Sequence, residues 1–307
     1  MDISEAFDRV DHYKLFNVLM DRSLPRQFIG LLTDWFAKCF VCVRWGSALS
    51  CWFKILAGVR QGGILSPVLF AIYMDPLIMQ LRRQGLGCRL LNEFYGCLLY
   101  ADDILLITPT VHAMHMMLRV CDKFADDFDM KFNCGKSFAM RIGKRFNEKC
   151  VSLQVDNNDI VYVKELKYLG VLVSAGLLLK FSVEHLRSKF YRTFNCIYSK
   201  SKASNSEMVT VDLLMSHCFP FLFFAVDAMS LSSSNIRILE SCINRALFRI
   251  FGSCDKSSLD YIKTVTGLHN IKAIVDKRHC SFINKLIADV SYSNLLLVYG
   301  FNSLYSL

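Results

Sequence analysis

The pattern of apolar and polar positions predicts mixed strands and helices first, and mainly helices later in the chain. Residues 12–38 have the pattern of two helices, broken near Pro25, which suits a helix start. Residues 40–56 predict a strand, a Gly-Ser turn and a second strand. An apolar helix is expected over 67–81 and an amphipathic helix over 110–130.

Strand signals dominate the middle of the chain. The segment FYGCLLYADDILLIT, residues 94–108, predicts a β-hairpin with an Asp pair at its tip. Short strands are expected further on at KSFAMRIG, VSLQV, DIVYV and YLGVLVS, and helical patterns from about residue 180 onward. Strands and helices without regular β-α-β alternation, followed by a helical tail, predict an α+β domain and then an α-helical one.

The Asp pair, Asp102 and Asp103, lies between two runs of strand-forming apolar residues. This setting predicts that both carboxylates are buried. An ionised carboxylate that is taken out of water is strongly destabilised unless a positive group offsets its charge. The sequence leaves three candidates open: an Arg or Lys partner, a shared proton, or a metal ion.

Composition and charge narrow the class of protein. With 307 residues, 53% of them apolar and 21% charged, the chain is globular and not disordered. The net charge of +9 is uneven, because residues 1–174 hold 21 Lys and Arg against 18 Asp and Glu, whereas residues 175–307 hold 15 against 9. A basic second half favours a polyanionic partner, nucleic acid first, although a basic surface that only confers solubility is the alternative.

Cysteine usage and hydropathy indicate an intracellular protein. The thirteen cysteines are scattered and no secretory leader precedes them, so reduced thiols in a cytoplasmic or nuclear protein, and not a secreted one, are expected. Cys39 and Cys42 form a C-x-x-C without a second pair at zinc-finger spacing, so a zinc site is not expected. The most apolar stretch, residues 213–231, contains a His, a Pro and an Asp and predicts a buried core helix, not a membrane span.

Three motifs follow one another in the first third of the chain. They are MDISEAFDRVDH at residues 1–12, GVRQGGILSPVLF at 58–70 and YADD at 100–103. Each is weak alone, because an Asp pair in a turn and a Gly-rich turn before a helix are common. In this order they resemble the palm of reverse transcriptases, and most closely that of non-LTR (LINE-type) retrotransposons. The resemblance is specific over residues 1 to about 175 and loose beyond.

This resemblance implies a fold and a domain organisation. The expected fold is α+β: a right-hand polymerase palm, with an antiparallel sheet and helices on one face, and partial fingers. Residues 1–175 would form the palm with partial fingers, of which about 12–57 are fingers-like. Residues 176–307 would form an α-helical, thumb-like region.

The resemblance also assigns catalytic residues. It makes Asp2 and Asp102 the principal ligands of two Mg²⁺ ions, with Asp103 in support and Mn²⁺ as a substitute metal. Nucleotide addition uses two such ions about 3.5–4 Å apart, and Mg²⁺ prefers carboxylate oxygens. On this hypothesis, metal supplies the positive charge that the Asp pair requires.

Three further residues match substrate contacts of the family. Phe7 matches an aromatic residue beneath the sugar that would collide with a ribose 2′-hydroxyl; a core Phe is the alternative. Tyr100 matches a residue against the primer end, although a Tyr in a strand usually only packs. Lys136, which follows Asn133 in FNCGKSFAM, matches a lysine that assists at the leaving phosphate, and an exposed lysine before a strand is equally consistent.

Other matches concern the nucleotide and the nucleic acid. Gln61 and Gly62 match residues that contact the incoming nucleotide and the template, whereas Arg60 is equally consistent with a surface charge. LKYLGVLVS resembles the primer-grip hairpin through Leu169 and Gly170. Residues 180–202 are rich in cations. In the family, a basic helix at this place in the thumb binds along the backbone of the duplex, and a helical face exposed to solvent is the alternative explanation. The cations are Lys180, Arg187, Lys189, Arg192, Lys200 and Lys202, against Glu184 alone.

The function implied is an RNA-directed DNA polymerase that adds deoxynucleotides to a primer 3′ end. Its partners would be an RNA template, a DNA primer and deoxynucleoside triphosphates, with no membrane involved and the oligomeric state open. The chain starts at the first catalytic aspartate, whereas family members have fingers residues before it, so we expect a fragment that binds primer–template without extending it. Two alternative functions remain. The first is an RNA-directed RNA polymerase, against which Phe7 and Tyr100 argue. The second is a catalytically inactive nucleic-acid-binding remnant, which would have all the same residues, so the sequence does not separate it from an active polymerase.

Overall fold

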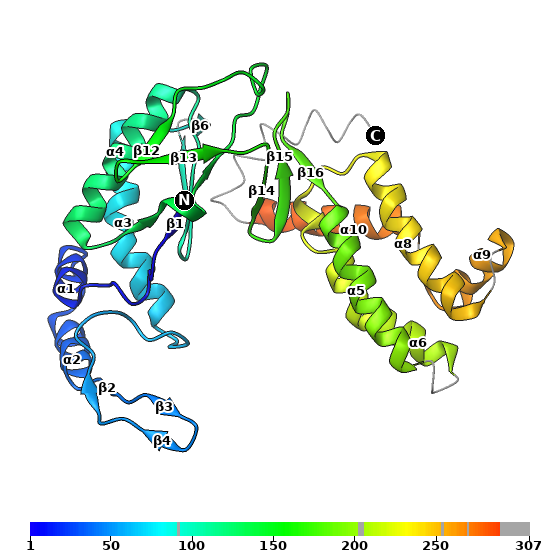
Figure 1. Ribbon diagram of the computed structural model, residues 1–307, viewed down its shortest axis with the longest axis horizontal. Coiled ribbons are helices and arrows are strands. Elements are labelled where there is room, and N and C mark those ends of the chain that lie inside the picture. The colour runs from blue at the N-terminus through cyan, green and yellow to red at the C-terminus, as the bar shows by residue number, and fades with distance from the viewer. Residues whose placement is uncertain (91–92, 202–205, 253–254, 269, 289–307) are drawn as a thin grey trace. The chain divides into compact units, whose positions relative to one another are not determined.

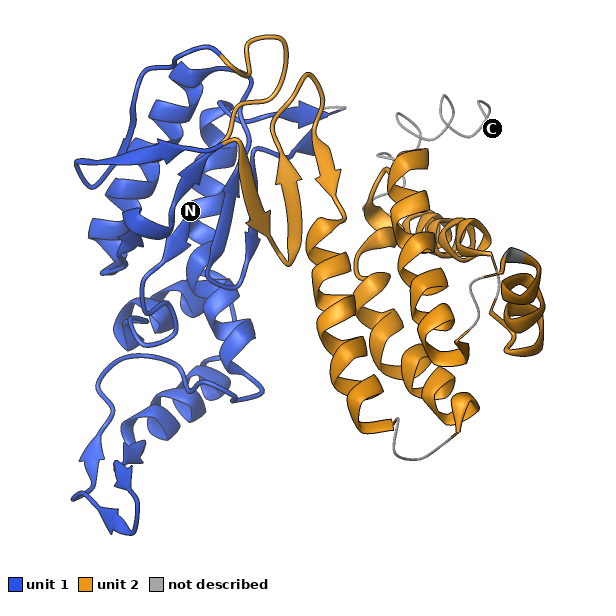
Figure 2. Ribbon diagram, turned by 45° about the vertical axis from the view of Figure 1, so that its right-hand side comes forward, with its two compact units in different colours: residues 1–139, 148–163 blue, residues 140–147, 164–307 orange. Residues whose placement is uncertain are grey.

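The computed structural model describes residues 1–307 apart from 91–92, 202–205, 253–254, 269 and 289–307 (Figure 1). The chain forms two compact units, each with its own hydrophobic core. Unit 1 comprises residues 1–139 and 148–163, and unit 2 comprises residues 140–147 and 164–307 (Figure 2). Within the described part of the chain, no helix is both long and apolar enough to cross a membrane.

The centre of unit 1 is an antiparallel four-stranded sheet with strand order β10-β1-β9-β8. Its strands are β1 (Asp2–Ile3), β8 (Cys97–Tyr100), β9 (Asp103–Leu106) and β10 (Phe132–Asn133). Strands β8 and β9 form a hairpin in which Tyr100 pairs with Asp103, as the apolar pattern around the Asp pair predicts. The predicted antiparallel sheet is confirmed.

Four helices complete unit 1. They are α1 (His12–Asp21), α2 (Arg26–Ala37), α3 (Ser66–Gln84) and α4 (Val111–Phe128). The predicted break near Pro25 is confirmed, because Pro25 lies immediately before α2. Helix α3 runs three residues past its expected end and stops at Gly85, which adopts the left-handed conformation that glycine tolerates best. Thr110 begins α4 by accepting a hydrogen bond from the amide of Ala113.

Helices α3 and α4 lie side by side against the central sheet (Figure 1). Ile3 on β1 and Ile104 on β9 are buried in the same core as Phe70 of α3 and Phe124 of α4. Because successive side chains of a strand point to opposite faces, the residues next to Ile3 and Ile104 face away from these helices. The sheet thus has an apolar face under the helices and a second face that carries the aspartates.

Shorter strands surround this framework. The hairpin of β3 (Arg44–Trp45) and β4 (Ala48–Leu49) turns at Gly46, so the predicted Gly-Ser turn is confirmed. Strand β11 is shorter than the predicted KSFAMRIG strand. The remaining strands of unit 1 are β2 (Phe40–Val41), β5 (Phe53–Lys54), β6 (Arg89–Leu90), β7 (Glu93–Phe94), β11 (Phe138–Ala139), β12 (Leu153–Val155) and β13 (Asn158–Tyr162).

Unit 2 consists of a small antiparallel sheet and a set of helices. The sheet contains β14 (Glu165–Tyr168), β15 (Val171–Ser174) and β16 (Lys180–Ser182). The helices are α5 (Glu184–Ser201), α6 (Glu207–Leu213), α7 (Phe219–Leu222), α8 (Ser233–Phe251), α9 (Lys256–Val265) and α10 (Ile271–Ala288). The predicted helical character after residue 180 is confirmed for the described residues. The boundary between the compact units lies after residue 163, whereas the predicted boundary lies after residue 175. The reason is that β14 and β15 form one sheet with β16 and therefore belong to unit 2. The division into palm and thumb stays a prediction.

The prediction of one buried core helix over residues 213–231 is wrong. One side of the stretch is buried, including Leu214, Cys218 and Leu222, whereas Phe221 and Phe224 are exposed. The stretch forms a π-helical turn (Leu214–Cys218), α7 and a 3₁₀ turn (Val226–Ala228). Pro220 explains part of the break, because its nitrogen carries no hydrogen for the helical bond to the preceding turn.

Candidate active site

Asp2 and Asp103 lie directly opposite each other on β1 and β9. The backbone hydrogen bonds flank this pair: Ile3 N donates to Asp102 O at 3.1 Å, and Ile104 N donates to Met1 O at 2.9 Å. The two aspartates therefore form a non-hydrogen-bonded antiparallel pair, the kind whose side chains come closest together. Strand pairing alone holds two carboxylates side by side on the open face of the sheet.

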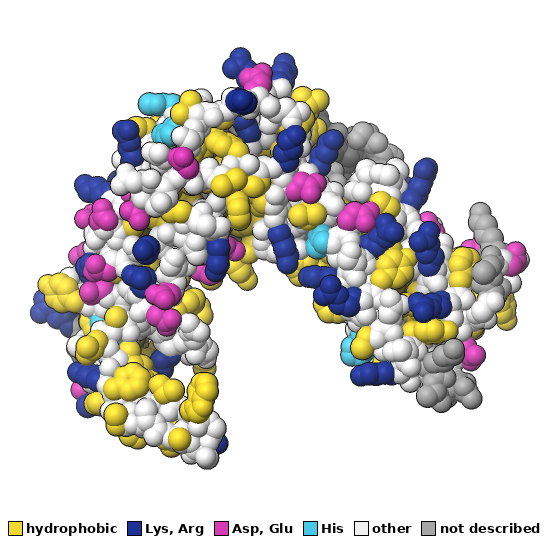
Figure 3. Space-filling model, viewed as in Figure 1, with side chains coloured by type: hydrophobic (Ala, Val, Ile, Leu, Met, Phe, Trp, Pro, Cys, Tyr) yellow, Lys and Arg dark blue, Asp and Glu magenta, His cyan; other side chains and the backbone are white. Residues whose placement is uncertain are grey.

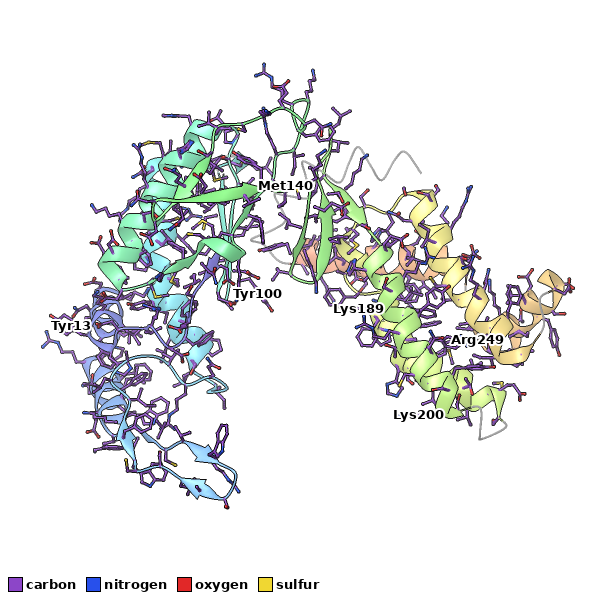
Figure 4. The ribbon with its side chains drawn as sticks, viewed as in Figure 1. Tyr13, Tyr100, Met140, Lys189, Lys200 and Arg249 are labelled. Carbon is purple, nitrogen blue, oxygen red and sulfur yellow. The ribbon has the colours of Figure 1, made fainter. Side chains whose placement is uncertain are left out.

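The third aspartate lies in the hairpin turn. Ala101 and Asp102 form the turn between the paired residues Tyr100 and Asp103. Ala101 has a φ of 51°, a left-handed conformation that costs a non-glycine residue about 1–2 kcal/mol. The expectation that both aspartates are buried is wrong for Asp102, which is exposed because it occupies the turn, whereas Asp103 is half-buried. Tyr100 is 64% exposed at the same tip (Figure 4).

Burial and the neighbouring carboxylates affect the ionisation of Asp103. Burial, and then the negative charges of Asp102 and Asp2, raise the pKa of Asp103 above its ordinary value. A like charge directly across a strand pair destabilises the fold, so a cation near these oxygens would be stabilising.

Lys136 is the one cation of the predicted set that lies near the pair. Its Nζ is 3.9 Å from Asp2 Oδ2, and its side chain is 72% exposed. Asn133, which pairs with Asp2 across β1 and β10, accepts a hydrogen bond from the amide of Lys136 through Oδ1 at 3.2 Å. This contact caps the 3₁₀ turn Cys134–Lys136, so the segment FNCGKSFAM positions Lys136 next to Asp2.

Ser137 is a residue that the sequence did not single out. It is buried at 1% exposure, and its Oγ accepts a hydrogen bond from the amide of Asp2 at 3.3 Å and donates one to Asn133 O at 2.8 Å. The hydroxyl thus ties β1 to β10 beside the aspartate. A serine directly after the matched lysine was the only signal in the sequence, and serines are too common to be selected on that basis.

Phe7 packs against the core with one face of its ring. It stacks on Phe70 of α3, with ring centroids 5.0 Å apart and planes 20° apart, and remains partly exposed. Its carbonyl accepts a hydrogen bond from Val59 N at 2.7 Å. A Cβ on Gly58, whose φ is +91°, would lie 2.9 Å from Asp8 O, so a glycine is required at this crossing. The first and second motifs are therefore joined through their backbones beside Phe7.

The other residues predicted from the second motif lie in an exposed loop. Arg60, Gln61 and Gly62 are all exposed, and Gln61 Nε2 donates to Asp8 Oδ2 at 3.5 Å. Arg60 and Gln61 border a groove of ≈ 610 Å³ that Asp8 and Trp52 also line. The structure thus brings the second motif to Phe7 and Asp8, and the segment FNCGKSFAM to Asp2.

The donor chemistry of the site suits a hard divalent cation. Among the described residues, no three His, Cys, Asp or Glu side chains are close enough to form a complete metal site by themselves. Mg²⁺ does not require one, because it is usually held by one or two carboxylates together with water and substrate phosphates. Asp2 and Asp103, paired across the strands with Asp102 beside them, fit such a shared site.

Comparison with known proteins shows the family of this chain. The family model for "Reverse transcriptase (RNA-dependent DNA polymerase)" matches residues 1–173. The chain is 27% identical over 183 residues to a retrovirus-related Pol polyprotein from type-2 retrotransposable element R2DM of Drosophila melanogaster. The aligned region covers 57% of this chain and 17% of that protein. The chain is 29% identical over 226 residues to a probable RNA-directed DNA polymerase from transposon X-element of the same species, covering 69% and 23%.

A third relative extends further along the chain. The RNA-directed DNA polymerase from mobile element jockey of Drosophila funebris is 24% identical over 259 residues, covering 80% of this chain and 28% of that protein. The chain thus spans less than a third of the length of each of these relatives. The family match includes all three aspartates, Phe7 and Lys136. This chain belongs to the reverse transcriptase (RNA-dependent DNA polymerase) family, with the polymerases of non-LTR retrotransposons as its relatives.

Proposed function

We propose that this chain carries the catalytic centre of an RNA-directed DNA polymerase that adds deoxynucleotides to a primer 3′ end on an RNA template. The observation that carries the proposal is the pairing of Asp2 with Asp103, with Asp102 in the adjoining turn, on the open face of an antiparallel sheet. Charge repulsion in this arrangement is relieved when cations bind, and the family's chemistry requires such cations.

Asp2, Asp102 and Asp103 would hold the two Mg²⁺ ions, or Mn²⁺ in their place. When bound, such ions activate the primer hydroxyl and neutralise charge on the triphosphate. The chain's own contribution is a rigid support: Ser137 fixes the amide of Asp2, and the β8–β9 hairpin fixes the other two carboxylates. Lys136, which lies close to Asp2 and is exposed, would bind a phosphate or donate a proton to the leaving group.

The remaining predicted residues would bind substrate. The ring of Phe7, supported from behind by Phe70, presents an edge that excludes a ribose 2′-hydroxyl. Gln61 and Gly62, with Arg60, offer an exposed loop to the nucleotide and template, and Tyr100 offers its exposed ring to the primer end. Residues 12–57 would act as fingers and the helices of unit 2 as a thumb. All twelve described cysteines are free, which suits a site of action inside the cell.

A metal titration tests the proposal without depending on turnover. Binding of Mn²⁺ to the 307-residue chain, measured by electron paramagnetic resonance with primer–template and a deoxynucleoside triphosphate present, should weaken at least about tenfold in Asp2→Asn and Asp103→Asn. Asp159→Asn, at an exposed position of unit 1, is the matched control and should leave Mn²⁺ binding unchanged.

Primer extension on an RNA template is the second readout. Extension by the chain that disappears in Asp103→Asn would support the proposal directly. If the chain binds primer–template but Mn²⁺ binding is the same in all variants, the catalytic proposal fails. The chain would then be a non-catalytic nucleic-acid-binding remnant.

A further inference from the structure

Helices α3 and α4 of unit 1 border a groove that the polymerase chemistry does not use. The groove has a volume of ≈ 410 Å³ and lies between the two helices, which pack side by side. Both helices cover the apolar face of the central sheet, whereas the aspartates of the candidate active site lie on its other face. The groove therefore belongs to the helical side of unit 1. Its lining residues are Gln80, Arg83 and Gln84 of α3 and Met116, Arg119, Val120 and Lys123 of α4.

The groove carries three cations, Arg83, Arg119 and Lys123, all of them exposed. No Asp or Glu lines it in the described part of the chain, and none of the three cations forms an ion pair there. By contrast, Arg82, next to Arg83, forms an ion pair with Glu93 at 3.6 Å. Arg119 and Lys123 lie four residues apart on α4, where two like charges repel each other. The groove therefore has a surplus of positive charge that an acidic ligand would offset.

The acidic residues of α4 do not neutralise these cations. Asp122 accepts a hydrogen bond from the amide of Asp156 at 3.2 Å, so it faces the turn between β12 and β13 and not the groove. Asp126 and Asp127 lie in the last turn of α4, and among the described residues neither forms an ion pair with Lys123. The donors of the groove therefore remain available to a ligand.

The groove also has an apolar part. Val120 is buried and Met116 is half-buried, and the amide side chains of Gln80 and Gln84 add neutral donors and acceptors on the α3 side. Methionine adapts to apolar partners of different shapes, and Met and Arg are both enriched in protein–protein interfaces. A nucleic-acid backbone would gain little from these apolar side chains, because its phosphates bind through charge. The combination of cations and apolar surface favours a protein ligand with both acidic and apolar side chains.

We propose that this groove is a docking site for an acidic amphipathic helix of a partner protein. A ligand helix that lies along α3 and α4 would place its apolar face on Met116 and Val120. Its carboxylates would pair with Arg83 on one side and with Arg119 and Lys123 on the other. Lys and Arg side chains are visible along the surface that α4 forms, at the upper left of Figure 3, and would guide an acidic ligand to the groove.

The proposal is independent of the polymerase proposal, because it rests on residues outside the candidate active site and is tested by binding. Fluorescence anisotropy of the 307-residue chain is measured with a labelled helical peptide of about 18 residues, with leucines along one face and glutamates on both flanks of that face. The double variant Arg119→Gln/Lys123→Gln should weaken peptide binding about tenfold or more, because charge-assisted contacts are lost. Arg83→Gln should also weaken it, because α3 forms the opposite side of the groove. Unchanged affinity in the double variant would overturn the proposal.

The matched control removes the same charge outside the groove. Arg26 and Lys131 are exposed in unit 1 and do not line the groove. Arg26→Gln/Lys131→Gln should therefore change peptide affinity by no more than about twofold, through general electrostatics. Both double variants alter exposed side chains, and equal melting temperatures would confirm that folding is intact. Equal losses of affinity in the two double variants would refute a specific site.

A second peptide tests the apolar contact. It keeps every glutamate and carries serine in place of each leucine, so its charge is the same as that of the first peptide. It should bind the parent chain about tenfold more weakly, because it has no apolar face to place on Met116 and Val120. Equal affinity of the two peptides would show attraction by charge alone and would contradict docking of an amphipathic helix.

Two further measurements separate the other occupants of the groove. A short RNA–DNA duplex at saturating concentration should leave the peptide bound; displacement of the peptide by the duplex would assign the groove to nucleic acid and refute the proposal. Sedimentation equilibrium without peptide should give the same mass for the parent chain and for Arg119→Gln/Lys123→Gln. A dimer that dissociates only in this double variant would show that a second copy of the chain occupies the groove in place of a partner helix.

Discussion

Asp2 and Asp103 form a pair of like charges that the register of β1 and β9 holds opposite each other. The backbone, and not the side chains, enforces this proximity, since the hydrogen bonds on either side of the pair fix the strands. The site therefore retains a local instability in the absence of cations.

The variant Asp103→Asn should be more stable than the parent chain in metal-free buffer at neutral pH. Removing one of two facing carboxylates relieves about 0.2–1 kcal/mol of repulsion, the range for cross-strand pairs. Chemical denaturation with EDTA present measures the free energy of unfolding. Added Mg²⁺ should then stabilise the parent chain more than the variant, because only the parent retains the full carboxylate set. Lower stability of the variant in EDTA would contradict the predicted repulsion.

The same repulsion predicts a pH dependence. The pKa of Asp103 in the folded chain lies above its ordinary value of 3.8, so the folded state holds the proton more tightly than the unfolded state. Stability of the parent chain should fall as pH rises from 3.8 through this higher folded pKa. The advantage of Asp103→Asn should be absent below this window and complete above it. A stability difference that is constant across the window would refute the assignment.

Replacing Ser137 by Ala should destabilise unit 1 and displace Asp2. The buried hydroxyl bridges the amide of Asp2 and the carbonyl of Asn133, and leaving those groups unpaired costs about 1–3 kcal/mol. Thermal unfolding measures this loss, and Mn²⁺ affinity reports on Asp2. Ser152→Ala, at an exposed position of the same unit, is the control and should change neither quantity. Unchanged Mn²⁺ affinity in Ser137→Ala would limit the serine to a structural role.

Replacing Phe7 by Val should raise the incorporation of ribonucleotides relative to deoxynucleotides. The smaller side chain leaves space where the ring, stacked on Phe70, would meet a 2′-hydroxyl. Competition between the two nucleotides gives the ratio of their kcat/KM values, or of their Kd values if the chain does not turn over. Phe124→Leu, a fully buried position of the same core, should lose stability without changing this ratio. If the ratio is unchanged in Phe7→Val, Phe7 only packs in the core and does not select against ribonucleotides.

Gly170→Ala should destabilise unit 2 for two separable reasons. Gly170 has a φ of +85°, which costs other residues about 1–2 kcal/mol, and a Cβ there would lie 2.8 Å from the ring of Phe224. Gly252→Ala, with a φ of +68° and open space around it, isolates the conformational cost. Phe224→Leu should reduce the cost of Gly170→Ala and leave that of Gly252→Ala unchanged. Denaturation of the parent chain, of Gly170→Ala, of Phe224→Leu and of their double variant completes the cycle. Zero coupling between positions 170 and 224 would exclude the steric contribution.

The sequence determined the local elements and the family. Runs of strand-forming apolar residues on both sides of Asp102 and Asp103 indicated the hairpin, and Pro25 indicated the break between the first two helices. These features depend on neighbouring residues, so they can be read from one chain. The order of the three motifs identified the reverse transcriptase family, and the family match over residues 1–173 confirmed it.

Only the tertiary structure decided which residues meet. The pairing of Asp2 with Asp103 and the burial of Ser137 beside them depend on strand register between segments about 100 residues apart or more. A shift by one residue would turn each side chain to the other face of its strand, and no local pattern fixes that choice.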